Sequence, residues 1–188
     1  MLSLNWNMIT LARVLVYLLI GAAGCQAASA KQRAFDVRKE NVSIRFHILF
    51  PLYGRIHGRF ERVRGQFDLN HRNPTRSTIS VEVETASINS NHQVRDAYLR
   101  SPALLSAREF PTAVFQSDTI TQTAKNAVRI NGRLTLRGIT QPITVNAFLI
   151  RNAFQGTTSF YLSDFGINGL LGFMFAKLHL TMRIEAGR

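Results

Sequence analysis

Apolar and polar residues alternate one by one along most of the chain from Phe35 onward, and this alternation constrains the fold more than any other feature. In its first clear run, every second side chain from Val42 to Phe50 is apolar. Further runs of the same kind lie at 79–84, 128–137 and 178–184. A period of two is typical of antiparallel strands that turn one face to a core and the other to water.

Other segments between these runs also have the composition of strands. They lie at 55–69, 112–122, 142–151 and 153–164. Turn residues separate the segments, at Asn73-Pro74, Gly138, Gln141-Pro142 and 166–172. Because many short strands at such spacing fit a sandwich or a barrel, and no strand alternates with a helix, the sequence predicts an all-β antiparallel domain.

Glycines interrupt the inward-facing positions of the long strands at Gly58, Gly65 and Gly132. Glycine inside a strand commonly marks a sharp bend or the close approach of a ligand or another backbone. Bends of this kind favour a closing barrel over a flat sandwich. The two roles, a bend alone or room for a ligand, are equally compatible with the sequence.

One interval, 91–105, departs from the alternation. Val94, Tyr98 and, after a proline, Leu105 recur near helical spacing behind Asn91, which is a candidate N-cap. We expect a short helix followed by an irregular segment there. Such an insertion would cross an edge of the barrel or cover one of its ends.

Residues 1–30 have the pattern of an export signal. Arg13 precedes the apolar run 14–20, and Ala28-Ser29-Ala30 supplies a small-x-small cleavage pattern. The apolar run is shorter than the roughly 20 residues that a transmembrane helix needs. We therefore expect cleavage before Lys31, export to the periplasm and a mature domain of residues 31–188. An uncleaved N-terminal anchor is the alternative.

Cys25 is the sole cysteine of the chain. It follows Ala22-Ala23-Gly24, a weak context for lipoprotein-type processing, so lipid anchoring at Cys25 is a second and less favoured outcome. Cleavage after Ala30 would leave no cysteine and no disulfide, and the apolar core would then have to stabilise the domain.

The chain is strongly basic, with a formal net charge of +12. Arginine supplies most of this charge, and its guanidinium favours the phosphate groups of anionic lipids. An anionic membrane surface is therefore one candidate partner, beside the interpretation of an ordinary solvated surface. Nucleic acid, the usual partner of so basic a chain, is seldom met by an exported protein, so we expect no nucleic-acid partner. No feature of the sequence indicates an oligomeric state.

Catalytic motifs find no support in the sequence. There is no Gly-x-Ser-x-Gly elbow, the acidic residues are scattered, and we expect neither catalytic residues nor a metal site. His47, His57 and His179 fall on outward positions of strands. His47 and His57 would face each other across a hairpin, where a metal site is the less favoured alternative to exposed histidines.

The chain contains 13 phenylalanines, and many of them fall on the predicted inner face. A barrel of about eight strands has an interior that is either just filled by side chains or able to hold one small ligand. A filled core is therefore one interpretation, and a ligand site lined by rings is the other. The predicted lining consists of Phe46, Ile48, Phe50, Phe60, Phe67, Ile79, Val81, Val83, Phe115, Leu134 and Leu136.

A series of short motifs is spread over 35–186. Each motif is weak alone, but their order and spacing together are specific, and by them the chain resembles the YceI-like family of exported proteins. The motifs are Phe35-Asp36-Val37, Ser43-x-x-Phe46, Gly58-Arg59-Phe60, Gly65-x-Phe67-x-Leu69, Ala86-Ser87-Ile88, Val94-Arg95-Asp96-x-x-Leu99-Arg100-Ser101, Phe110-Pro111-x-Ala113-x-Phe115-x-Ser117, Ile130-x-Gly132-x-Leu134-Thr135-Leu136-x-Gly138-Ile139-Thr140-x-Pro142 and Ser163-Asp164-Phe165-Gly166-Ile167.

This resemblance implies an elongated, lipocalin-like antiparallel barrel with a short helical insertion. It also implies binding of a polyisoprenoid, a quinone-type or other prenyl lipid, in a long apolar channel, with no cofactor beyond that lipid. The sequence departs from the family pattern at three places. The histidine that usually precedes Ser43 is absent, with Asn41-Val42 in its place. Leu162 stands where an arginine usually precedes Ser163, and Leu104-Leu105 where an aromatic pair is usual.

Our leading hypothesis is an exported lipid-binding protein that sequesters or carries a prenyl chain in the barrel interior. The alternative is an envelope stress or interaction protein with a filled barrel and a basic docking surface. A third candidate, an enzyme at the barrel mouth, requires titratable groups that converge. Arg95 and Asp96 are expected either to tie the inserted helix down as an ion pair or to contact a lipid headgroup.

Overall fold

The structure, a computed structural model, describes residues 33–37, 42–50, 54–69, 74–150, 153–168 and 176–185, all within the unit Gln32–Arg188. The predicted export signal, its cleavage site and Cys25 lie outside the described residues. The strands are β1 (Arg33–Val37), β2 (Val42–Phe50), β3 (Gly54–Phe60), β4 (Val63–Leu69), β5 (Thr78–Glu84), β6 (Ile88–Asn89), β7 (Thr112–Ala124), β8 (Ala127–Leu136), β9 (Ile139–Ile150), β10 (Ala153–Tyr161) and β11 (Lys177–Glu185).

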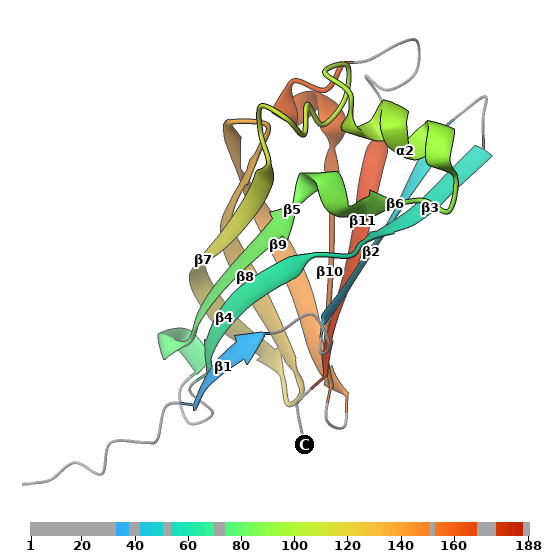
Figure 1. Ribbon diagram of the computed structural model, residues 1–188. Coiled ribbons are helices and arrows are strands. Elements are labelled where there is room, and N and C mark those ends of the chain that lie inside the picture. The colour runs from blue at the N-terminus through green and yellow to red at the C-terminus, as the bar shows by residue number, and fades with distance from the viewer. Residues whose placement is uncertain are drawn as a thin grey trace, which may run out of the picture. The chain divides into compact units, whose positions relative to one another are not determined.

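All of these strands belong to one antiparallel sheet, in the order β1-β4-β5-β7-β8-β9-β10-β11-β2-β3-β6. Although β3 and β4 lie near opposite ends of this order, only Glu61 and Arg62 separate them in the chain. Glu61 N donates to Ser87 O at 3.1 Å, and Glu84 N donates to Arg62 O at 3.0 Å. The sheet therefore curls round on itself (Figure 1), and the predicted lipocalin-like fold is confirmed.

The structure has more strand segments than the predicted number because two long strands are each broken once and the two-residue strand β6 is added. β1 pairs with β4, with Val37 opposite Gly65, and β2 pairs with β3, with Ile44 opposite Phe60. β1 and β2 thus form one arm of a long hairpin, and β3 and β4 form the other. Each arm is interrupted between the two ladders. The strongly bent hairpin allows β4 to continue the sheet towards β5 while β2 pairs with β11.

The turn between β8 and β9 falls at Arg137 and Gly138, as predicted for the glycine, and both residues have positive φ angles, of 53° and 74°. Positive φ at both positions is typical of a two-residue hairpin turn. The predicted turn at Gln141-Pro142 is wrong, because Pro142 lies inside β9 opposite Arg133. A proline is tolerated there because the ladder from β9 to β10 begins only at Asn146.

The predicted helix is α2 (Gln93–Arg100), which lies at the same end of the curled sheet as the short helix η4 (Leu162–Phe165) (Figure 1). The expected N-cap at Asn91 is wrong: His92 is the N-cap, and its Nδ1 accepts a hydrogen bond from Arg95 N at 3.3 Å. Val94 and Tyr98 are exposed, and the helix instead buries Leu99. The short helices η2 (Pro74–Arg76) and η3 (Thr85–Ser87) complete the described elements.

Polar contacts from α2 and its N-terminal approach hold the helix against β6. Asp96 is buried and accepts hydrogen bonds from Ser90 N, at 2.8 Å, and from Ser90 Oγ. Arg95 donates from Nε to Ser90 Oγ at 2.8 Å and from Nη2 to Ser90 O at 2.7 Å. Arg100 donates to the backbone oxygens of Ala86 and Ile88. Arg95 and Asp96 therefore tie the helix down through hydrogen bonds to Ser90, and not through the ion pair with each other that was one of the two expectations.

The half of the barrel remote from α2 is filled by apolar side chains. Phe67 of β4 lies opposite Ile79 of β5, and Ile120 of β7 lies opposite Ile130 of β8. All four side chains are buried, and Ile130 is only 1% exposed. Among the described residues, no helix combines the length and the apolar character needed to cross a bilayer.

Candidate functional site

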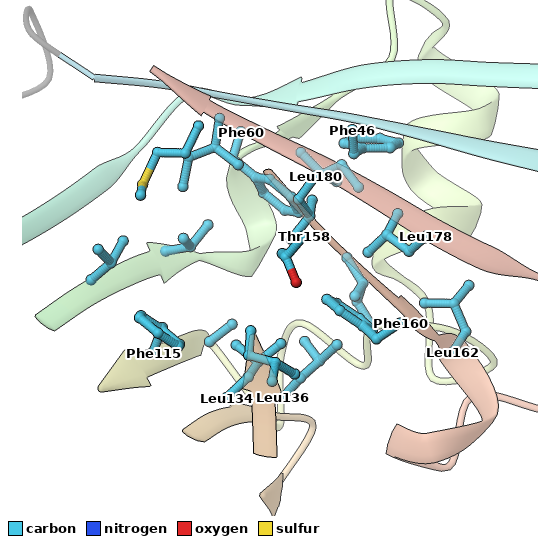
Figure 2. A pocket seen from close by; sticks show the side chains of 18 of the residues that line it. Phe46, Phe60, Phe115, Leu134, Leu136, Thr158, Phe160, Leu162, Leu178 and Leu180 are labelled. Carbon is cyan, nitrogen blue, oxygen red and sulfur yellow. The ribbon is translucent and has the colours of Figure 1, made fainter. Parts of the chain in front are cut away.

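A cavity occupies the half of the barrel that lies towards α2. Its volume is about 140 Å³, close to that of an engineered apolar cavity of about 150 Å³ that stays dry and takes up benzene. Figure 2 shows Phe46, Leu178 and Leu180 on one side of this space, and Phe115, Leu134 and Leu136 on the other. Among the described residues, the cavity therefore occupies one half of the barrel, and buried apolar side chains such as Phe67 and Ile130 occupy the other.

Most of the predicted lining residues lie around this cavity. They are Phe46, Ile48, Phe60, Val81, Val83, Phe115, Leu134 and Leu136. Phe67 and Ile79 are buried in the filled half and are not among the described lining residues. The side chain of Phe50 lies outside the described ones. A role of these residues in ligand binding stays a prediction.

Sequence reasoning missed a large part of the lining. Alternation in β11 had already placed Leu178, Leu180 and Met182 on an inner face, and that signal was sufficient to include them. Ile44, Ile143, Val145 and Phe160 carry the same signal in β2, β9 and β10. Ala113, Gly156 and Thr158 lie in phase with the inner positions of β7 and β10, but small or polar side chains do not mark an inner face. The other lining residues come from segments without alternation, for which the sequence offers no comparable signal.

The end of the cavity towards α2 is lined by leucines and an isoleucine from α2, η4 and the segments beside them. Leu99 belongs to α2, Leu104 and Leu105 to the segment after it, and Leu162 and Ile167 to η4 and its C-terminal side. The backbone N of Leu105 donates to Leu99 O at 3.1 Å, which folds this segment back on the helix. Three of these leucines stand where the sequence departs from the family pattern, so those departures fall on the cavity wall.

Thr158 is the one lining side chain with a polar atom among the described lining residues. Its Oγ1 donates a hydrogen bond to Thr144 O on β9 at 2.8 Å. The hydroxyl proton is therefore already engaged, and no titratable side chain joins Thr158 among the described lining residues. Since polar groups are costly to bury without partners, this space suits a hydrocarbon guest and offers no site for a charged one.

Phenylalanine rings cover the inward glycines. A Cβ built at Gly58 would lie 2.6 Å from Phe46 Cε1, and one at Gly132 would lie 2.7 Å from Phe115 Cε2. The equivalent distance from Gly65 to Phe67 Cε2 is 3.1 Å. These glycines thus make room for rings of the barrel wall, which is the close approach that the sequence left unspecified.

The three outward histidines lie side by side on adjacent strands. His47 of β2 pairs with His57 of β3 and with His179 of β11. The ring centroids of His47 and His179 are 4.6 Å apart with nearly parallel planes, and those of His47 and His57 are 6.0 Å apart. In the part of the chain that the structure describes, no three metal-ligating side chains gather at one point.

Three acidic side chains of the described surface pair with arginines. The guanidinium of Arg62 binds both carboxylate oxygens of Glu84, with 2.6 Å between Nη2 and Oε1. This hydrogen bonding lowers the pKa of Glu84, and the charges of Arg62 and Arg64 add to the effect. Arg59 binds Glu61 at 2.9 Å, and Arg133 binds Asp118 at 3.0 Å. No pair of these carboxylates lies at the cavity.

Comparisons with a family model and with known protein sequences each find a match over most of the chain. The model of the YceI-like domain matches residues 35–186. A UPF0312 protein of Shewanella baltica (strain OS155) is 35% identical over 182 residues, which cover 90% of this chain and 95% of that protein. A UPF0312 protein of Shewanella sp. (strain W3-18-1) is 33% identical over 172 residues, covering 86% of this chain and 90% of the relative.

Solved structures with a similar fold include BcnA of Burkholderia cenocepacia, with a TM-score of 0.73 and 17% identity, covering 81% of this chain and all of that one. A polyisoprenoid binding domain from Saccharophagus degradans, implicated in plant cell wall breakdown, has a TM-score of 0.60 and 12% identity. The match spans the whole length of that domain and 84% of this chain. From the match of the family model and the identity to the curated relatives, the chain belongs to the YceI-like family.

Proposed function

We propose that this protein is exported to the periplasm, where it binds a prenyl lipid chain in the cavity and acts as a carrier or reservoir for it. The observation that carries the proposal is the cavity itself, whose described lining is apolar except for Thr158. Membership of a family with a polyisoprenoid-binding structural relative supports the choice of lipid. Binding without catalysis is the simplest role for a space that no titratable side chain among the described lining residues reaches.

The length of the cavity limits how much of a prenyl chain it can hold. On β11 the lining runs from Leu178 to Met182, which spans about 13 Å along a strand that rises about 3.3 Å per residue. Phe67, Ile79 and Ile130 fill the barrel beyond this length. The proposal is therefore for a few isoprene units inside the barrel, as a short chain or as the end of a longer one.

Energetics favour a carrier over a tight trap. Burial of each methylene is worth about 0.8 kcal/mol relative to water. The competing state of a prenyl chain is a bilayer interior, however, which is as apolar as the cavity. Transfer between two apolar hosts is nearly neutral, so the lipid can be loaded and released at a membrane. An anionic membrane surface is the proposed partner for that exchange, given the net charge of +12 of the full chain, to which the export signal contributes only Arg13.

Mass spectrometry of organic extracts from the purified protein tests the proposal. We expect one prenyl lipid per protein in the wild type and a clear reduction in Val81→Phe, which fills the cavity from β5. Leu136→Phe, on β8, repeats the test from another wall. Ile79→Leu is the matched control, because it changes a buried residue two positions along β5 that is not among the described lining residues. Urea unfolding verifies that each variant is folded.

An extract without lipid, together with no uptake of an added polyprenol, would overturn the proposal. Equal lipid content in Val81→Phe, Leu136→Phe and Ile79→Leu would also count against it, since the lipid would then lie elsewhere.

A further inference from the structure

The outer surface of three neighbouring strands is basic. Because side chains alternate across a strand, the residues between the lining positions of β11, β2 and β3 point away from the cavity. We call this surface the basic face, and it consists of Lys177, His179, Arg45, His47, Arg55, His57 and Arg59. All seven side chains are exposed or half-buried. The segments 42–49, 54–60 and 177–184 contain no acidic residue.

Like charges lie directly opposite each other on this face. Arg45 pairs in register with Arg59, and His47 lies between His57 and His179. Neighbouring strands are about 4.8 Å apart and alternate residues of one strand about 6.6 Å apart. Both spacings are shorter than the Debye length of about 8 Å at physiological ionic strength, so the potentials of neighbouring charges add. Like charges directly opposite also destabilise a sheet, and an anion bound over them relieves that repulsion.

Few groups offset this charge. Glu61, at the end of β3, binds Arg59 and accepts a hydrogen bond from Asn89 Nδ2 at 2.7 Å. On the other side of β11, the ring of Tyr161 lies under the ammonium of Lys177, 5.6 Å from it. The remaining cations of the basic face are therefore directed at solvent, and Glu61 is shared by two partners within the protein.

An apolar side chain accompanies these cations. Leu49 lies on the same outer face of β2, opposite Arg55, and is 57% exposed. Cations beside a protruding leucine match the interface of an anionic bilayer, in which charge attracts the protein and an apolar group enters among the lipids. A metal ion fits this face less well, because stacked parallel rings direct their in-plane nitrogen lone pairs past each other.

We propose that the basic face docks the protein on an anionic membrane surface, and that protonation of His47, His57 and His179 strengthens this docking. The proposal rests on the proposed function, because a lipid carrier must meet the bilayer with which it exchanges its guest. The lining and the basic face alternate along the same strands, so docking brings the loaded half of the barrel to the membrane.

The sign of the pH dependence follows from the charges around the histidines. Partial burial lowers the pKa of His47, and the neighbouring His179, Arg55 and His57 lower it further. His47 therefore takes up its proton at a lower pH than an ordinary histidine. Negative lipid headgroups counteract the repulsion from the basic residues, so binding to the membrane favours proton uptake, and by linkage a lower pH favours binding.

Sedimentation of the purified protein with large vesicles tests this proposal. Vesicles of phosphatidylcholine with phosphatidylglycerol are compared with vesicles of phosphatidylcholine alone, at about pH 7.5 and about pH 5.5, on either side of the ordinary histidine pKa of about 6.5. We expect binding to the anionic vesicles only, stronger by about fivefold or more at the lower pH, and weakened by added salt. The His47→Gln, His57→Gln, His179→Gln triple variant should lose the pH response.

A matched pair of variants separates a local surface from net charge. Arg45→Gln with Arg55→Gln removes two charges from the basic face and should weaken binding about tenfold or more. Lys125→Gln with Arg129→Gln removes the same charge from the exposed side of the β7–β8 hairpin and should leave binding within about twofold. Circular dichroism at both pH values checks that all variants are folded.

Three outcomes would overturn the docking proposal: equal binding to neutral vesicles, equal weakening by both variant pairs, or complete displacement from vesicles by millimolar inorganic phosphate, which would indicate a site for free anions. Lipid in the cavity is measured separately by extraction. A wild-type protein that contains lipid but does not sediment with vesicles disproves the docking surface and leaves the proposed carrier function standing.

Discussion

Phe46 and Gly58 lie directly opposite each other on β2 and β3, and the phenyl ring covers the glycine. The ring occupies the space that a Cβ at position 58 would need, and Asn89 O lies 2.9 Å from the same point. Phe46 also packs against Phe60, with 5.6 Å between ring centroids. The glycine therefore lets an aromatic ring lie flat on the barrel wall beside the cavity.

Gly58→Ala should force the Phe46 ring away from the wall and lower the free energy of unfolding by about 1–3 kcal/mol, as is usual for overpacked cores. Urea unfolding measures the loss. The same substitution in a Phe46→Leu background should cost less, because the smaller side chain can move aside. An equal cost in both backgrounds would show that the ring is not the obstacle.

The buried carboxylate of Asp96 gives a second prediction. Asp96→Ala removes the acceptor for Ser90 N and Ser90 Oγ, and leaving such groups unsatisfied costs about 1–3 kcal/mol. We expect lower stability in urea and faster hydrogen exchange of the α2 amides. Asp118→Ala is the control: its carboxylate is exposed in a pair with Arg133, and the effect should stay within about 0.5 kcal/mol. Unchanged exchange in α2 would contradict the anchoring role.

The pair of Arg62 and Glu84, beside the junction of β3 and β4, gives a prediction on pH. Hydrogen bonding from Arg62 lowers the pKa of Glu84 below its ordinary range. The ionised form is thus favoured in the folded state, so the contribution to stability is present above the ordinary pKa and is lost as the pH falls through the lowered one. Arg62→Gln should raise the pKa of Glu84, as followed by carboxyl NMR. Arg64→Gln, which acts through charge alone, should raise it less.

The alternation of residues predicted the fold and the inner face well, because burial on one side of a strand leaves a direct record in the sequence. Phe46, Val81 and Leu134 were placed inside for that reason, and they do line the cavity. The same pattern cannot give the position of a residue along the barrel axis. Phe67 and Ile79 show this, since they share the inner face but lie in the filled half.

The lining at the end of the cavity towards α2 could not be predicted from the alternation of residues. Leu104 and Leu105 reach the cavity through a segment whose course depends on single backbone hydrogen bonds, such as Leu105 N to Leu99 O. The face of α2 was also misjudged: Val94 and Tyr98 suggested an apolar face, but the contacts of Arg95 and Asp96 with Ser90 set the rotation of the helix. Tertiary polar contacts of this kind leave no periodic signal.

Because one half of the interior is packed and the other contains the cavity, the two halves differ in how well they tolerate substitution. Interlocking side chains such as Phe67 and Ile130 hold the architecture together, and their replacement is penalised whatever the guest. Residues around the hollow, such as Leu104 and Leu162, face the cavity on one side, where a change in side-chain size can be accommodated. Substitutions can thus reshape the space at one end of the molecule while the opposite end preserves the architecture.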